Sequence, residues 1–81
     1  MHYVYILQSQ KDSFKYYVGL TDNLARRVGQ HNTLPGCSYT IKYGPWNLKT
    51  HIAFEDNRLA GKFEIYLKSH SGKAFLKKHL L

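Results

Sequence analysis

Residues 16–32 read YYVGLTDNLARRVGQHN, an apolar stretch that passes directly into a polar one. Residues 14–20 contain three aromatic side chains and Val18, and a strand is predicted there. Thr21 or Asp22 can cap a helix that continues to about Asn32. The sequence therefore predicts a strand that leads straight into a helix, and the rest of the fold can be built outward from it.

A second strand is predicted at residues 2–8, HYVYILQ, on the other side of a polar turn. A hairpin centred on Lys11 would place Tyr5 opposite Tyr17. Directly opposed residues share one face of a sheet. We therefore expect the two phenols side by side on one face, a placement that a slip of one residue would abolish.

A third strand and a second helix are predicted further along the chain. Residues 48–54 alternate between apolar and polar side chains, as a half-buried strand does. Asp56 or Asn57 can cap a helix that reaches about Lys68. The apolar residues expected to line the buried side of this helix are Leu59, Phe63 and Leu67.

The last part of the chain predicts a short helix. Residues 70–72, His-Ser-Gly, are expected to end the preceding helix, and residues 73–81 form the last one. Its inward side chains would be Phe75, Leu76 and Leu80. The predicted order is ββαβαα, in one domain spanning residues 1–81. This indicates an α/β (α+β) fold, with a small antiparallel sheet flanked by helices.

Charge is the strongest compositional signal. The 81 residues hold twelve Lys and Arg against five Asp and Glu, a formal net charge of +7. Such a field attracts polyanions, mainly nucleic acid, although it can also serve solubility alone. A single cysteine, Cys37, excludes an intramolecular disulfide. With no signal-peptide pattern and no apolar run near the ~20 residues of a membrane span, we expect a cytoplasmic protein without a membrane partner.

Arg27 and His31 stand four residues apart on the first helix, at the border of an apolar stripe formed by Leu24 and Val28. Arg27 can hold a phosphate with two parallel hydrogen bonds and stabilise charge in a phosphoryl transition state. His31 can relay a proton near neutral pH. The alternative is a pair of ordinary helix-surface residues.

Glu64 is a carboxylate with no second acid three or four residues away. One carboxylate, several waters and a substrate phosphate can together hold Mg²⁺, so a site for one metal ion is allowed. The alternative is a solvated ion pair with Lys68, four residues later, or with Arg58. Spacing alone favours the ion pair.

Seven tyrosines are many for a chain of this length. A phenol has a pKa near 10, so a tyrosine base working at pH 7 needs its pKa lowered by roughly 3 units. The guanidinium of Arg27, the imidazole of His31 and a bound metal ion could supply that shift together. Most of the tyrosines are expected to pack in the core or at its rim.

The irregular stretch from Thr33 to Trp46 is long enough to be functional. Its aromatic side chains could stack on unpaired bases or could anchor the loop to the core. The candidate nucleic-acid-binding residues, in this loop and on the helices, are Arg26, Tyr39, Lys42, Tyr43 and Lys68.

These residues, taken in order, resemble the GIY-YIG nuclease domain. The segments that carry the resemblance are Tyr3-Val4-Tyr5, Tyr17-Val18-Gly19, Arg27, His31 and Glu64. The resemblance covers nearly the whole chain and is closest to small stand-alone bacterial members related to the N-terminal nuclease domain of the excision-repair endonuclease. It implies a three-stranded antiparallel sheet flanked by helices.

The resemblance also implies an activity, the hydrolysis of DNA phosphodiester bonds with one Mg²⁺ ion, for which Mn²⁺ can substitute. Tyr5 would be the general base or would position the attacking water, and Tyr17 would hydrogen-bond in the same site. Arg27 would stabilise the pentavalent phosphate and His31 would accept the phenol proton. Glu64 would hold the metal against the leaving 3′ oxygen, and the products would carry a 5′ phosphate and a 3′ hydroxyl.

The chain departs from the family pattern at three points. Tyr3 stands where the family has glycine, no asparagine follows Asn57, and no appended DNA-binding domain is expected. The substrate would be DNA, branched or damaged, bound by the chain's own surface, with a partner protein or as a homodimer. The alternatives are a non-catalytic nucleic-acid-binding module with the same fold and a tyrosine nucleophile that forms a covalent DNA adduct.

Overall fold

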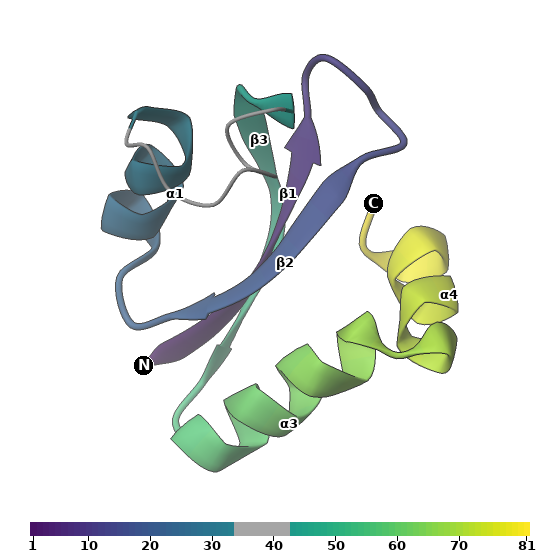
Figure 1. The fold of residues 1–81 in the computed structure, drawn as a ribbon. Coiled ribbons are helices and arrows are strands. Elements are labelled where there is room, and N and C mark those ends of the chain that lie inside the picture. Colours follow the sequence, from purple (N-terminus) through teal and green to yellow (C-terminus); the bar gives the residue numbers. More distant parts are fainter. Residues whose placement is uncertain (34–42) are drawn as a thin grey trace.

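The computed structural model describes the backbone of residues 1–33 and 43–81, and the side chains of residues 1–30 and 43–81. Two strands are followed by a helix, a third strand and two more helices (Figure 1). These elements are β1 (His2–Ser9), β2 (Tyr16–Thr21), α1 (Leu24–Thr33), β3 (Trp46–Phe54), α3 (Asn57–Lys68) and α4 (His70–His79). The predicted α+β class is confirmed, and these elements follow the predicted order.

The strands form a three-stranded antiparallel sheet with the order β2-β1-β3. Tyr5 of β1 lies opposite Gly19 of β2, so the predicted register, with Tyr5 opposite Tyr17, is wrong by two residues. The hairpin turns later than expected because the N–H of Lys15 donates to the carbonyl of Asp12 at 2.9 Å, which closes an extra turn before β2.

The error in register leaves the faces of the sheet unchanged. Side chains alternate along a strand, so a shift of two residues returns each of them to the same face. Tyr5 and Tyr17 therefore do share a face, as diagonal rather than direct neighbours, with their ring centroids 6.3 Å apart.

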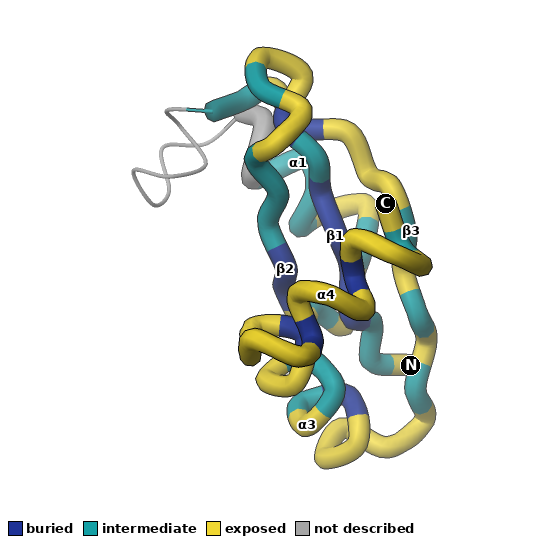
Figure 2. Tube along the Cα trace, turned by 90° about the vertical axis from the view of Figure 1, so that its right-hand side faces the viewer, coloured by how far each residue is buried: buried dark blue, intermediate teal, exposed yellow. Residues whose placement is uncertain are grey.

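Helices cover both faces of the sheet, which buries most of the central strand β1 (Figure 1, Figure 2). The face toward α3 and α4 is built around the buried residues Val4, Ile6, Val18, Ala60, Leu67 and Leu76. The opposite face, toward α1, is built around Tyr5, Leu7 and Trp46, with Tyr17, Leu24, Val28 and Tyr43 packed against them. Tyr5 is thus buried because it belongs to β1, the central strand, which has a strand on each side and helices on both faces.

The turn between α3 and α4 is tighter than predicted. α4 begins at His70, so residues 70–72 form its first turn instead of a break. Ser69 joins the two helices, because its backbone N–H donates to the carbonyl of Tyr66 and its hydroxyl accepts from the N–H of Gly72. The chain passes so close to itself here that a Cβ at Gly72 would overlap the Tyr66 carbonyl.

The buried side of α3 is also rotated from its predicted position. Leu59, expected inside, is 54% exposed, whereas Ala60 and Leu67 are fully buried. The small side chain of Ala60 lets the helix approach the sheet closely. On α4, Leu76 is buried as predicted and Phe75 is 37% exposed.

The contact at Gly72 gives a stability prediction. Gly72→Ala should lower the free energy of unfolding by about 2 kcal/mol, because the added methyl forces the backbone of the α3–α4 turn apart. Urea denaturation followed by circular dichroism measures this change. Gly61→Ala is the matched control, since nothing lies within 4 Å of a Cβ at that helical position. It should stabilise α3 by about 0.5–1 kcal/mol, and equal effects from the two variants would contradict the packing.

Candidate active site

The ring of Tyr5 lies across the backbone of Gly19. A Cβ at position 19 would overlap the hydroxyl and the outer ring carbons of Tyr5, so only glycine leaves room for the phenol. Tyr5 is 1% exposed. Because Gly19 belongs to the edge strand β2, the hydroxyl end of Tyr5 points toward the edge of the sheet.

Helix α1 brings Arg27 to the two phenols. Its cap is Asn23, not Thr21 or Asp22 as predicted, since the Asn23 side-chain oxygen accepts from the N–H of Arg26 at 3.1 Å. The hydroxyl of Thr21 in turn accepts from the N–H of Asn23 in the short connection between β2 and α1. The helix therefore starts directly beside the end of β2, and Arg27 lies one turn in.

Arg27 is a hydrogen-bond partner of both Tyr5 and Tyr17. It also donates to the side-chain oxygen of Gln30 at 3.1 Å, a bond that orients the guanidinium. Burial lowers the pKa of Arg27, but the two phenols outweigh this effect and leave the pKa raised. The phenols and the guanidinium form one hydrogen-bonded group.

The phenol of Tyr5 is neutral at physiological pH. Burial raises its pKa to about 12, and the nearby Tyr17 and Glu64 add to the increase, while the hydrogen bond from Arg27 opposes it. The direction is opposite to the one that a tyrosine base needs at pH 7. Tyr5 therefore keeps its proton near pH 7 while its oxygen accepts a hydrogen bond from Arg27.

Glu64 lies within electrostatic reach of Tyr5, because its charge contributes to the raised pKa of that phenol. It projects from α3 on the same side as Ala60 and Leu67, and its side chain is only 18% exposed. α3 and α1 cover opposite faces of the sheet. Glu64 and Tyr5 interact nevertheless, since the phenol extends over Gly19 to the edge that α3 runs beside.

The carboxylate of Glu64 forms an ion pair with the ammonium group of Lys68 at 2.9 Å. The helical ion pair, one of the two alternatives for Glu64, is therefore present. Within the described residues no group of three or more His, Cys, Asp or Glu side chains could hold a metal ion. A partly buried carboxylate still fits a site for one divalent ion completed by water and phosphate, in which the ion takes the place of Lys68.

The structure describes only some of the other predicted site residues. The backbone of His31 lies one turn after Arg27 in α1, but its side chain, Tyr39 and Lys42 all fall outside the residues whose side chains the structure describes. Arg26 is exposed and pairs with Asp22 at 3.3 Å, away from the phenols.

Tyr43 is half-buried, and its role as a candidate nucleic-acid contact stays a prediction. It packs against the cluster that contains Tyr5. Its carbonyl accepts from the hydroxyl of Ser9, and its ring lies 5.3 Å from the ammonium group of Lys15. These contacts fit the anchoring alternative for this end of the loop.

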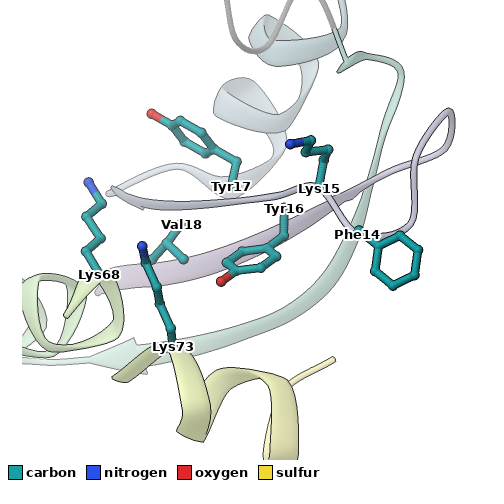
Figure 3. A pocket seen from close by; sticks show the side chains of 7 residues that line it. All are labelled: Phe14, Lys15, Tyr16, Tyr17, Val18, Lys68 and Lys73. Carbon is teal, nitrogen blue, oxygen red and sulfur yellow. The ribbon is translucent and has the colours of Figure 1, made fainter. Parts of the chain in front are cut away.

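The sequence analysis missed a pocket beside β2. It has a volume of about 420 Å³ and is lined by Phe14, Lys15, Tyr16, Tyr17, Val18, Lys68 and Lys73 (Figure 3). Lys68 and Lys73 rise from α3 and α4 toward the strand. No local pattern could have found this pocket, because its residues come from three separated parts of the chain.

A second missed neighbour is His51 of β3. It lies directly opposite Tyr5 across the β1–β3 ladder and contacts the ring of Tyr3, with centroids 6.0 Å apart. The alternation of β3 placed His51 on one face of its strand, but only the pairing of β3 with β1 shows that this is the face of Tyr5.

Comparison with known proteins identifies the family of this chain. The protein-family model described as the GIY-YIG catalytic domain matches residues 1–78. The chain belongs to the GIY-YIG family. A UPF0213 protein of Clostridium perfringens is 41% identical over 68 residues, which make up 84% of this chain and 71% of that protein.

Two further relatives of this GIY-YIG chain extend the comparison. The solution NMR structure of UPF0213 protein BH0048 from Bacillus halodurans has a TM-score of 0.57 and 34% identity, over 95% of this chain and 82% of that one. It confirms the fold. The structure-specific endonuclease subunit SLX1 homolog of Giardia intestinalis is 34% identical over 65 residues, which cover 76% of this chain and 18% of that protein.

In the part of the GIY-YIG chain that the structure describes, every helix is too short or too polar to cross a bilayer.

The buried phenol gives a prediction about pH. Because the pKa of Tyr5 is raised in the folded state, its contribution to stability is complete below pH 10 and is lost as the pH rises from 10 toward about 12. Unfolding free energies measured over this range should fall less steeply for Tyr5→Phe than for the unchanged protein. Identical slopes would show that Tyr5 ionises as readily in the folded chain as in the unfolded one.

Proposed function

We propose that this GIY-YIG chain is a metal-dependent endonuclease that hydrolyses DNA phosphodiester bonds in DNA repair or processing. One observation carries the proposal. Two phenols, the guanidinium that hydrogen-bonds to both, and a carboxylate whose charge reaches one of them come together from β1, β2, α1 and α3. This is the donor set that a phosphate and a divalent cation require.

Arg27 is the group that would bind the scissile phosphate. Its hydrogen bonds to Tyr5 and Tyr17 and to Gln30 hold the guanidinium in place before any substrate arrives. Because the guanidinium is already in position, little reorganisation free energy is needed when negative charge builds up on the phosphate. The same bonds would put both phenol oxygens close to a phosphate bound by Arg27.

Tyr5 would orient the attacking water. Its phenol is neutral near pH 7, so the hydroxyl acts first through a hydrogen bond. A divalent cation bound by Glu64, Mg²⁺ or Mn²⁺, would supply positive charge that stabilises the leaving oxygen and lowers the pKa of the nearby phenol. His31, one helical turn after Arg27, would accept the phenol proton of Tyr5, and the resulting phenolate would take a proton from the attacking water.

DNA is the proposed substrate, because the net charge of +7 attracts a polyanion and the family is one of nucleases. The similarity to a structure-specific endonuclease subunit supports branched DNA, and damaged DNA is the other candidate. The chain would bind it through its own basic surface, with a partner protein or as a homodimer.

A second candidate function is a nucleic-acid-binding module that does not cut. Two observations favour it. The raised pKa of Tyr5 opposes its use as a base, and Lys68 occupies the carboxylate of Glu64. The two functions differ in whether addition of a divalent cation produces nicks.

Nicking of supercoiled plasmid tests the endonuclease proposal. With Mg²⁺ or Mn²⁺ the unchanged protein should convert supercoiled plasmid to the open circular form. Arg27→Ala and Glu64→Gln should each reduce the rate by about a hundredfold or more, because each removes charge stabilisation in the transition state. Gel electrophoresis over time measures the rates.

Arg58→Ala is the control, since it removes one exposed arginine that is not among the candidate site residues. It should retain nicking within about threefold, as expected for loss of one surface charge. Full activity in both Arg27→Ala and Glu64→Gln would rule out this site. Tight binding without any nicking by the unchanged protein would leave the non-catalytic module.

Lys68 gives a prediction about metal binding. Its ammonium group contacts the Glu64 carboxylate at 2.9 Å and so competes with a metal ion for that carboxylate. Lys68→Gln should strengthen Mn²⁺ binding by up to about fivefold, the amount that a partly exposed ion pair contributes. Calorimetric titration measures the affinity. An unchanged Mn²⁺ affinity would mean that the metal does not bind through Glu64, and Lys62→Gln controls for the loss of a lysine on α3.

A further inference from the structure

The pocket beside β2 is continuous with the candidate active site. Tyr17 belongs to both, and Lys68 lines the pocket while it contacts Glu64. The pocket also contains side chains from both faces of the edge strand, with Tyr17 on one side of β2 and Tyr16 on the other (Figure 3). A strand of nucleic acid held at Arg27 would therefore extend past this opening.

The charge of the pocket is positive. Lys15, Lys68 and Lys73 come from the residue before β2, from α3 and from α4, and no Asp or Glu is among the residues that line the pocket. Of these three lysines, only Lys68 forms a salt bridge with a described residue. Lys15 lies on the Tyr17 side of β2, with its ammonium group 5.3 Å from the ring of Tyr43, whereas Lys68 and Lys73 reach toward the strand from α3 and α4 (Figure 3). Lysines from two helices beside one opening provide a site for a phosphate group.

The pocket also offers a surface for a flat apolar group. Phe14 lies at one end of it and is 89% exposed, an unusual position for a large aromatic side chain. Exposed aromatic rings next to basic side chains are what single-stranded nucleic acids use for base stacking. A volume of about 420 Å³ is in the range of pockets that accept small organic ligands.

We infer that this pocket binds an unpaired segment of the substrate strand, with a base against Phe14 at one end and a phosphate at Lys73 at the other (Figure 3). The inference rests on the proposed function, because that function is what leads a strand past Tyr17. An acidic peptide would satisfy the lysines but offers no base to stack on the ring. Unpaired nucleotides occur at branches and flaps, so the pocket favours substrates with a single-stranded part.

Binding of a short fluorescein-labelled DNA single strand, followed by anisotropy without divalent cations, tests the phosphate contact. Lys73→Gln should weaken binding about fivefold and make the dependence of log affinity on log salt shallower by about one unit. Lys62→Gln is the matched control, because Lys62 is an exposed lysine of α3 that does not line the pocket. Equal losses in the two variants would mean that only overall charge matters and would overturn the inference.

The base contact is tested with a second strand in which every nucleotide is abasic. Phe14→Ala should weaken binding of the normal strand at least about fivefold and leave binding of the abasic strand unchanged. Leu59→Ala, which truncates another exposed apolar side chain, should change neither. Equal effects of Phe14→Ala on both strands, or no effect on either, would overturn the assignment. Displacement of the normal strand by poly-glutamate at equal charge concentration would identify an acidic peptide as the occupant instead.

These binding measurements separate the inference from the proposed function, because they contain no metal and no step of hydrolysis. Loss of the Lys73 and Phe14 contrasts while nicking still depends on Arg27 removes the pocket assignment alone. Retention of both contrasts in a protein that never nicks removes the endonuclease proposal and leaves a nucleotide-binding pocket on a binding module.

Discussion

The candidate site depends on the close approach of the Tyr5 ring to the backbone of Gly19. Tyr5 starts from the central strand, where it would otherwise be enclosed by side chains. The absence of a side chain at position 19 lets its phenol cross the edge strand and reach the rim of the sheet. There it meets Arg27 from α1 on one side and the charge of Glu64 from α3 on the other. Two helices on opposite faces thus contribute to one group of side chains.

The electrostatics of the site follow from this placement. Burial keeps the Tyr5 phenol neutral, and the phenols in turn stabilise the charge of Arg27. The carboxylate of Glu64 and the guanidinium of Arg27 have different partners. Glu64 forms an ion pair with Lys68, and Arg27 hydrogen-bonds to the two phenols. The groups that would meet a phosphate and a cation are therefore already held by neighbouring side chains in this structure.

Sequence reasoning succeeded where the decisive contacts are local or periodic. The alternation of residues in β1 and β2 gave the correct face for Tyr5 and Tyr17, and the strand-to-helix step brought Arg27 beside them. The predicted register of the hairpin was wrong, because a hydrogen bond between Lys15 and Asp12 lengthens the turn and no residue pattern predicts that bond. The predicted start of α4 was also wrong. The sequence pattern predicts that Gly72 ends a helix, whereas in the structure it lies inside α4 and lets the backbone pass close to the carbonyl of Tyr66.

The alternatives for Glu64 show the limit most clearly. Spacing favoured an ion pair with Lys68, and the structure contains that pair, yet it also brings the same carboxylate within reach of a phenol far away in the chain. Glu64 therefore has both neighbours, Lys68 and Tyr5. Its position in the helix determines the residues one turn away but not the residues against which the helix packs.

By itself, the sequence determined the class of the fold, the faces of the strands and the residue types of the site, because these follow from side-chain periodicity and local chemistry. The tertiary structure alone decided that Glu64 lies near Tyr5, that His51 stands opposite Tyr5, and that Phe14 and Lys73 line one pocket. These pairs are far apart in the chain. Their distances depend on how α3 and α4 pack on the sheet, and the free energy of that packing is shared among many side chains rather than carried by a motif.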